Sequence, residues 1–189
     1  LNWEKKQFPV PIEFAVDAIV LANAEEELKG PVGFTWQGYA SAANYAMLNK
    51  VELEKGLKWA EKAVTMNKNF NTLMAKAGLL KQLGKTEEAE KTKTAALALG
   101  SEAELNQYGY QLDNQGLHDD AIHILKLNTE RHPESANAWD SLGEVYAMKG
   151  DKENAVKNFK KSLSMNPPEN VKLNSIKYLK HYGEKIPDN

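Results

Sequence analysis

The densest group of side chains that could bind a metal ion is formed by His118, Asp119, Asp120 and His123. Two histidines that share a metal on one helix usually stand four residues apart, because that spacing puts them on one face. Here the spacing is five, which turns the second ring away from the first by about 140° on a helix of 3.6 residues per turn. The two aspartates fit the first turn of a helix, where the helix dipole favours negative charge. The sequence therefore predicts no metal site and no cofactor.

No group of residues has the spacing of a catalytic site. The sequence contains no glycine-rich phosphate-binding loop, no serine in a nucleophile elbow and no pair of carboxylates in an apolar setting. Cysteine is absent, which excludes disulfides, thiolate chemistry and cysteine-bound zinc. We therefore predict that the protein is not an enzyme.

The composition of the chain limits the classes of partner that it is expected to bind. Of the 189 residues, 42% are hydrophobic and 26% are charged, and 24 basic residues are spread among 26 acidic ones. A protein that binds nucleic acid is expected to carry a basic surface, whereas Arg131 is the only arginine of this chain. The longest apolar run, residues 15–24, is interrupted by Asp17 and Asn23 and is shorter than the ~20 residues of a membrane span. The composition predicts neither nucleic-acid binding nor membrane insertion.

A pattern of residue types recurs along the chain with a regular period, the mark of a repeat architecture. When Ala155 is aligned with Ala121, six further pairs of similar residues fall into register. These pairs are Gly143 with Gly109, Gly150 with Gly116, Leu142 with Tyr108, Trp139 with Leu105, Phe159 with Leu125, and Pro167 with Pro133. Two earlier units keep fewer of these residues, and the first helix of the earliest unit fits two registers. The pattern predicts four pairs of antiparallel helices, at residues 34-68, 69-100, 101-134 and 135-168.

Local signals mark the ends of these helices. Gly84, Gly116 and Gly150 stand where the first helix of a pair is expected to end, a place where a left-handed backbone favours glycine. Ser101 and Glu104 have the spacing of a capping box that opens a helix. The further predicted N-caps are Thr86, Ser135 and Asp151.

Small residues are expected where the two helices of a pair cross, because they let the backbones approach closely. The alignment places Gly109 opposite Ala121 in one pair and Gly143 opposite Ala155 in the next. We therefore expect each glycine to face the alanine of its own unit.

The unit from Asn137 to Pro167 resembles a tetratricopeptide repeat. The residues that carry the resemblance are Trp139, Leu142, Gly143, Tyr146, Ala155, Phe159 and Pro167. Weaker likeness extends back to about Phe34. The resemblance implies a predominantly all-α fold, a right-handed α-solenoid of antiparallel helix pairs spanning residues 34-170. Residues 169-185 would form an amphipathic capping helix at its C-terminal end.

The first residues differ in kind from the repeats. Apolar residues alternate with others from Val10 to Val16, a period of two that predicts a strand reaching Asp17, with Leu1, Trp3 and Lys5 as its hairpin partner. Residues 3-17 weakly resemble the closing strands of a bacterial β-rich domain of unknown function found in exported proteins. We therefore expect 1-17 to be a β-hairpin remnant of an upstream domain and 18-33 to be a helix and linker. The compartment stays undetermined by the sequence, and the resemblance favours an extracytoplasmic location, periplasmic or secreted, over a cytoplasmic one.

The residues that do not serve the repeat pattern are the candidates for binding. In a solenoid the first helices of successive units line a concave face. Binding uses the side chains of these helices that do not belong to the apolar stripe packed in the core, here called the core stripe. The predicted partner-binding groove comprises Asn106, Tyr110, Asp113, Asn114, Asn137, Asp140, Glu144, Lys81 and Gln82. The first two are favoured, because an aromatic ring with a polar tip beside an amide suits peptide recognition. The groove carries little positive charge, which predicts weak or no binding of acidic carboxyl-terminal peptides.

The leading hypothesis is thus a non-catalytic scaffold that binds a protein or peptide partner on the concave face of its repeat array. One alternative is homo-oligomerisation, with the N-terminal strands of two copies pairing edge to edge in a homodimer. Another is a repeat appendage of a larger protein whose further domain precedes Leu1.

Overall fold

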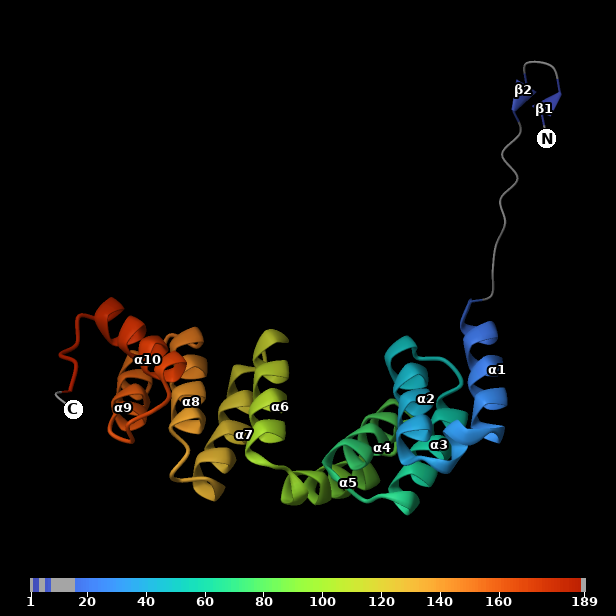
Figure 1. The fold of residues 1–189 in the computed structure, drawn as a ribbon, viewed down its shortest axis with the longest axis horizontal. Helices are drawn as coiled ribbons and strands as arrows, with labels where there is room; N and C mark the ends of the chain where they lie inside the picture. The colour runs from blue at the N-terminus through green and yellow to red at the C-terminus, as the bar shows by residue number, and fades with distance from the viewer. Residues whose placement is uncertain (1, 4–5, 8–15, 188–189) are drawn as a thin grey trace. The chain divides into compact units, whose positions relative to one another are not determined.

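The computed structural model describes residues 2–3, 6–7 and 16–187 (Figure 1). By their contacts the residues form two compact units, 1–98 and 99–189. The described part of the chain holds ten α-helices in antiparallel pairs, which confirms the predicted all-α class. The right-handed sense of the array stays a prediction.

The first unit contains two very short strands and the first five helices. Its elements are β1 (Asn2–Trp3), β2 (Lys6–Gln7), α1 (Val16–Lys29), the 3-10 helix η1 (Pro31–Phe34), α2 (Trp36–Asn49), α3 (Leu53–Met66), α4 (Phe70–Gln82) and α5 (Thr86–Leu99). α2 and α3 form an antiparallel pair, and α4 packs on both. The buried core residues of this unit include Leu21, Ala43, Ala60, Leu79 and Ala89, one from each helix.

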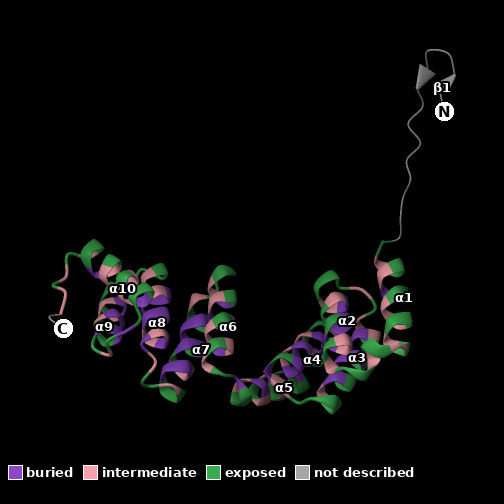
Figure 2. Ribbon diagram, viewed as in Figure 1, coloured by how far each residue is buried: buried purple, intermediate pink, exposed green. Residues whose placement is uncertain are grey.

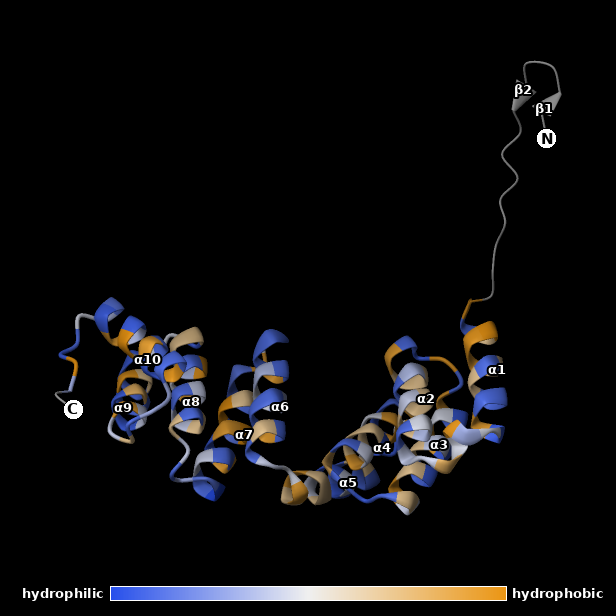
Figure 3. Cartoon of the chain, viewed as in Figure 1, coloured by the Kyte–Doolittle hydropathy of each residue, from blue (hydrophilic) through white to orange (hydrophobic). Residues whose placement is uncertain are grey.

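The second unit contains α6 (Glu102–Asn114), α7 (His118–Arg131), α8 (Ala136–Met148), α9 (Lys152–Leu163) and α10 (Glu169–His181). α6 pairs with α7 and α8 pairs with α9, whereas α10 packs on both α9 and α8. Purple, buried residues gather where these helices face one another (Figure 2), and the outward sides are mostly hydrophilic (Figure 3). This is the distribution expected of amphipathic helices that share a core.

The prediction for the N-terminal strands is partly wrong. β1 pairs antiparallel with β2, and Trp3 lies opposite Lys6 rather than opposite a residue of the predicted second strand. Val16 and Asp17, the end of the predicted second strand, instead open α1. The earlier part of that strand, residues 8–15, lies outside the described residues. A period of two over a few residues cannot distinguish a strand from the first turn of a helix. In the structure Asp17 of this turn accepts a hydrogen bond from Tyr45 on α2.

Helix ends follow the local signals closely. Gly84, Gly116 and Gly150 have φ angles of 77°, 76° and 83°, so the predicted left-handed turns are confirmed. Ser101 and Glu104 form the predicted capping box. Ser135 and Asp151 are N-caps as expected, whereas Thr86 is the first residue of α5 rather than the residue before it. The sequence did not reveal a second capping box, in which Asn69 and Thr72 begin α4.

The two registers left open for the first helix of the earliest unit are now resolved. α2 ends at Asn49, and a short loop leads to α3. Lys50 and Glu52 in this loop adopt left-handed φ angles of 56° and 45°. Since neither is glycine, the turn lacked the signal that marks the other helix ends.

At two helix crossings a glycine lies against a large side chain of the paired helix. A Cβ atom on Gly143 would lie 2.9 Å from two ring carbons of Phe159, and one on Gly109 would lie 2.7 Å from the side chain of Leu125. The expectation that each glycine faces the alanine of its unit stays a prediction. The glycines make room for the large side chain one turn later, and this allows Phe159 and Leu125 to be fully buried.

Candidate functional site

Polar side chains from three helices of the second unit occupy equivalent positions, each one repeat period after the last. One row consists of Asn106 on α6, Asp140 on α8 and Asn174 on α10, and the next row consists of Tyr110, Glu144 and Tyr178. We call these six residues the polar rows. Because α8 packs on both α6 and α10, the rows form one continuous side of the unit.

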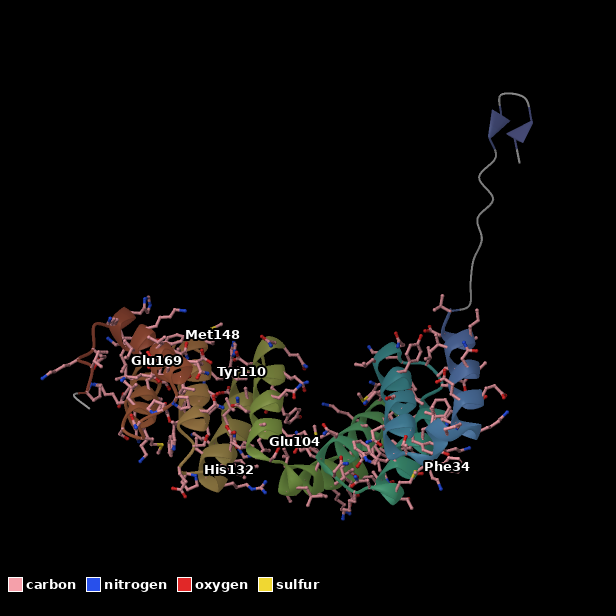
Figure 4. All side chains as sticks on the ribbon, in the orientation of Figure 1. Phe34, Glu104, Tyr110, His132, Met148 and Glu169 are labelled. Atoms are coloured by element: carbon pink, nitrogen blue, oxygen red, sulfur yellow. The ribbon has the colours of Figure 1, made fainter. Side chains whose placement is uncertain are left out.

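Hydrogen bonds connect neighbouring helices along these rows. The hydroxyl of Tyr110 donates to Oε2 of Glu144, and Nδ2 of Asn174 donates to Oε1 of the same carboxylate at 3.0 Å. Burial raises the pKa of the Tyr110 hydroxyl, and its bond to Glu144 raises it further. Figure 4 shows Tyr110 on the side of α6 that faces α8. Tyr110 therefore remains protonated at neutral pH and acts as a donor.

Asp140 is more buried than a groove residue was expected to be, with 5% of its surface exposed. Its carboxylate accepts hydrogen bonds from the hydroxyl of Ser175 and, at 2.7 Å, from Nδ2 of Asn174. Burial raises the pKa of Asp140 to about 6, although the two hydrogen bonds act in the opposite direction. In this structure α10 covers most of the Asp140 side chain, and a contact between Asp140 and a partner stays a prediction.

Two other predicted groove residues of this unit, Asn137 and Asp113, form hydrogen bonds outside the polar rows. Nδ2 of Asn137 donates to Oε1 of Glu102 at 2.9 Å, and this bond links α8 to the start of α6. Oδ1 of Asp113 lies 2.6 Å from Nδ1 of His118. Asn114 is exposed at the end of α6. Of the predicted set, Asn106, Tyr110, Asp113, Asn137 and Glu144 remain partly exposed.

Asn106 has an unusual feature. Its side-chain oxygen is buried and, among the described residues, has no hydrogen-bond partner. Buried amide oxygens nearly always have one, so this side chain retains an unused acceptor.

Lys81 and Gln82 belong to the first unit, near the end of α4. Both are exposed, and Nε2 of Gln82 donates to the backbone oxygen of Met47 at 3.0 Å. These two predicted groove residues therefore lie on a different compact unit from the polar rows.

The carboxylates of the polar rows lack nearby positive charge. In the described part of the chain, no lysine, arginine or histidine lies within ion-pair distance of Asp140 or Glu144. Burial raises the pKa of Tyr178, and the charges of Glu144, Asp140 and Asp113 raise it as well. Carboxylates of α6 and α8 therefore act on Tyr178 of α10, whose ring centroid also lies 5.7 Å from Nζ of Lys177.

The histidines and aspartates considered as metal ligands point to separate partners. His118 contacts Asp113, whereas Asp119 forms an ion pair with Lys149 at 2.5 Å. His123 is exposed on α7. Within residues 2–3, 6–7 and 16–187, no three His, Asp or Glu side chains come together as metal ligands would. Over the same residues, no helix is long and apolar enough to cross a bilayer.

Sequence reasoning missed the contribution of α10. Asn174, Ser175 and Tyr178 belong to a segment that was interpreted only as a polar cap. The signal was present, because Asn174 follows Asp140 at the same interval at which Asp140 follows Asn106. Extending the repeat register by one more helix would have predicted that α10 continues the rows.

Comparison with known proteins identifies the repeat. The model of the tetratricopeptide repeat family matches residues 136–169, which include α8 and α9. No curated protein matches the chain.

Several solved structures are similar to this chain. YrrB, described as a TPR protein with an unusual peptide-binding site, is 22% identical, covers 86% of this chain and 84% of its own, and has a TM-score of 0.47. PilF of Pseudomonas aeruginosa is 21% identical over 78% of this chain and 69% of that one, with a TM-score of 0.46. A MamA structure is 19% identical over 79% and 88% of the two chains, with a TM-score of 0.44.

Proposed function

We propose that this tetratricopeptide repeat protein is a non-catalytic scaffold that binds an extended, positively charged segment of a partner protein across the polar rows. Its mechanism is surface complementarity: side chains at a constant spacing meet successive groups of the partner. A scaffold of this kind needs a rigid surface rather than a reactive group.

The observation that carries the proposal is the repetition of polar side chains at equivalent positions on three adjacent helices. A segment that crosses α6, α8 and α10 meets a phenol or a carboxylate from each helix in one row. The bonds from Tyr110 and Asn174 to Glu144 hold these groups in place before the partner arrives. Such preorganisation lowers the entropic cost of binding.

The charge of the rows favours a basic segment. Glu144 is half-buried and has no cation within ion-pair distance among the described residues, so a lysine or arginine of a partner gains a charge-assisted hydrogen bond there. The side-chain oxygen of Asn106 has no partner among the described residues, and in the proposed complex it accepts from a backbone N–H or an ammonium group. An acidic peptide would face repulsion at the same positions.

The test is a titration of the full chain with two fluorescently labelled, unstructured peptides that alternate serine with either lysine or glutamate. We expect saturable binding of the lysine peptide and none of the glutamate peptide. Tyr110→Ala and Asn106→Ala should each lower the affinity for the lysine peptide by about 5- to 30-fold, the range of a residue that contributes strongly to an interface.

The matched control is Gln111→Ala, which changes an exposed side chain of the same helix on a side away from Asn106 and Tyr110. It should leave affinity unchanged. Equal binding of both peptides, or binding of the lysine peptide that survives the Tyr110 and Asn106 changes, would show that the polar rows are not the binding surface.

A further inference from the structure

A groove of about 830 Å³ lies between α1 and α2 in the first unit, far along the sequence from the polar rows. α1 contributes side chains at the spacing of a single helical face, and α2 contributes a second such face. The lining from α1 is Val20, Leu21, Asn23, Ala24, Glu27 and Leu28, and the lining from α2 includes Gln37, Gly38, Ser41, Ala42 and Tyr45.

The groove exists because α2 presents small residues to α1. Ser41 and Ala42 have short side chains, so the two helices face each other there without filling the space between them. Gly38 instead lets Val32 of η1 pack directly against α2, since an added Cβ would lie 2.5 Å from Cγ1 of Val32. The two helices are joined at both ends of the groove. At one end the hydroxyl of Tyr45 donates to Oδ1 of Asp17 at 2.8 Å, and at the other end η1 connects the helices.

Much of the wall is apolar and in contact with water. Leu21 and Ala42 form a buried floor, whereas Val20 and Leu28 are half-buried and Val32 on η1 is 40% exposed. Apolar surface of this kind is removed from water favourably by a ligand that covers it. Figure 3 shows orange, hydrophobic residues mainly at the start of α1 and blue, hydrophilic ones farther along it.

One acidic side chain of this wall forms no ion pair. Glu25 pairs with Lys55 at 2.9 Å, and Glu26 pairs with Lys29 at 2.5 Å. Glu27, which lines the groove, is exposed and forms no ion pair with any described residue. A cation that binds beside the apolar wall is therefore complemented by Glu27 without displacing another cation.

We infer that the α1–α2 groove binds one face of an amphipathic helix from a partner protein, with apolar side chains on its floor and a lysine or arginine beside Glu27. A helix fits better than a strand, because the walls are two helices and offer no free backbone edge with which a strand could pair. Apolar side chains three and four residues apart match a groove between helical walls. This site is separate from the polar rows and stands independently of the proposed function.

The experiment uses the full chain and a labelled helical peptide that carries leucines at positions i, i+3, i+4 and i+7 and one flanking lysine. We expect saturable binding in fluorescence anisotropy. Ser41→Leu, which fills the groove from an exposed position on α2, should weaken binding at least about tenfold, because apolar contact area is lost. Asn44→Leu adds the same side chain at an exposed α2 position outside the lining and should leave binding unchanged.

The charge requirement has its own pair of variants. Glu27→Gln should lower the affinity for this helical peptide by about two- to fivefold and reduce the salt dependence of binding, as expected for one exposed ion pair. Glu26→Gln, whose carboxylate is already paired, should have no effect. Binding that Ser41→Leu does not change would overturn the inference. Two other results would also overturn it: binding of a small apolar dye in the groove without binding of the peptide, or a dimer of the chain that Ser41→Leu dissociates.

Discussion

The hydroxyl of Tyr110 donates a hydrogen bond to the carboxylate of Glu144, and the two residues hold equivalent positions in helices one repeat apart. The bond joins α6 to α8, and Asn174 on α10 donates to the same carboxylate. A single acidic side chain thus links three helices that are far apart in the sequence.

Removing the Tyr110 hydroxyl should lower stability. In Tyr110→Phe the half-buried carboxylate of Glu144 loses one of two donors, and hydrogen bonds to charged groups contribute about 1.5 to 3 kcal/mol. We expect a loss of this size in the free energy of unfolding, measured by urea denaturation followed by circular dichroism. Tyr182→Phe, a change of the same chemistry at the C-cap of α10, serves as the control. An unchanged midpoint for Tyr110→Phe would show that this bond contributes nothing to the fold.

Gly143→Ala should destabilise the α8–α9 pair by about 1 to 3 kcal/mol, the usual cost of overpacking a core. The new methyl group would lie 2.9 Å from the ring of Phe159, which is fully buried and stacked on Tyr178 at 4.7 Å. The ring therefore has little room to move. Thermal unfolding measures the loss of stability. The double variant Gly143→Ala/Phe159→Leu should lose less stability than the sum of the losses of the two single variants, because leucine is smaller than the ring.

Gly150→Ala is the comparison that distinguishes the steric clash expected in Gly143→Ala from strain of the backbone. Gly150 has a φ of 83°, and a Cβ atom added there would meet no other atom within 4 Å, so its substitution strains only the backbone. We expect a loss of about 1 kcal/mol there, and the Phe159→Leu change should not alter it. Rescue of both glycine variants by Phe159→Leu would contradict the proposed contact.

The buried carboxylate of Asp140 should make stability depend on pH. Its pKa rises from 3.8 to about 6 in the folded protein because of burial, so the folded state binds more protons than the unfolded state between these values. The contribution of Asp140 to the free energy of unfolding is therefore fully present below pH 4 and decreases as the pH rises to about 6. By linkage this decrease amounts to about 3 kcal/mol.

The measurement compares the wild type with Asp140→Asn at several pH values, since subtraction cancels the titration of other groups. We expect the stability of the variant relative to the wild type to rise between pH 4 and pH 6 and to level off above. Several surface carboxyls, including Asp119, Asp151 and Glu184, have lowered pKa values and act in the opposite direction, but both proteins contain them. A difference that stays constant with pH would show that Asp140 titrates normally.

Ser175→Ala should loosen α10. The Ser175 side chain is fully buried and donates to Asp140, so the substitution leaves a buried carboxylate with one donor fewer. We expect faster hydrogen exchange of the α10 amides and a loss of about 1 to 3 kcal/mol in their protection, with smaller changes in α6 and α7. Ser164→Ala, at the exposed C-cap of α9, is the matched control. Exchange that is uniform across the second unit would show that α10 does not open separately.

Much of the secondary structure follows from the sequence alone, because it depends on neighbours a few residues away. The glycine turns at Gly84, Gly116 and Gly150 and the capping box of Ser101 require only local backbone geometry. The repeat spacing likewise predicts the helix pair that matches the tetratricopeptide repeat family. The loop at Lys50 and Glu52 escaped prediction because its left-handed residues are not glycine.

The candidate site could be predicted only in part. The repeat register identified Asn106, Tyr110 and Glu144 as residues outside the core stripe, and the structure places them on one side of the second unit. It could not show that Asp140 is buried, because the atoms that cover it belong to Asn174 and Ser175 on a helix one repeat later.

The sequence by itself therefore determined most helix boundaries, the repeat and the absence of a recognisable catalytic motif, since each rests on local spacing. Only the tertiary structure decided which side chains meet. It set Gly143 against the ring of Phe159, buried Asp140 beneath α10, and left a groove where small residues of α2 face α1. The physical reason is that contacts and burial depend on atoms brought together from distant segments, and a periodic pattern records only the face on which each residue lies.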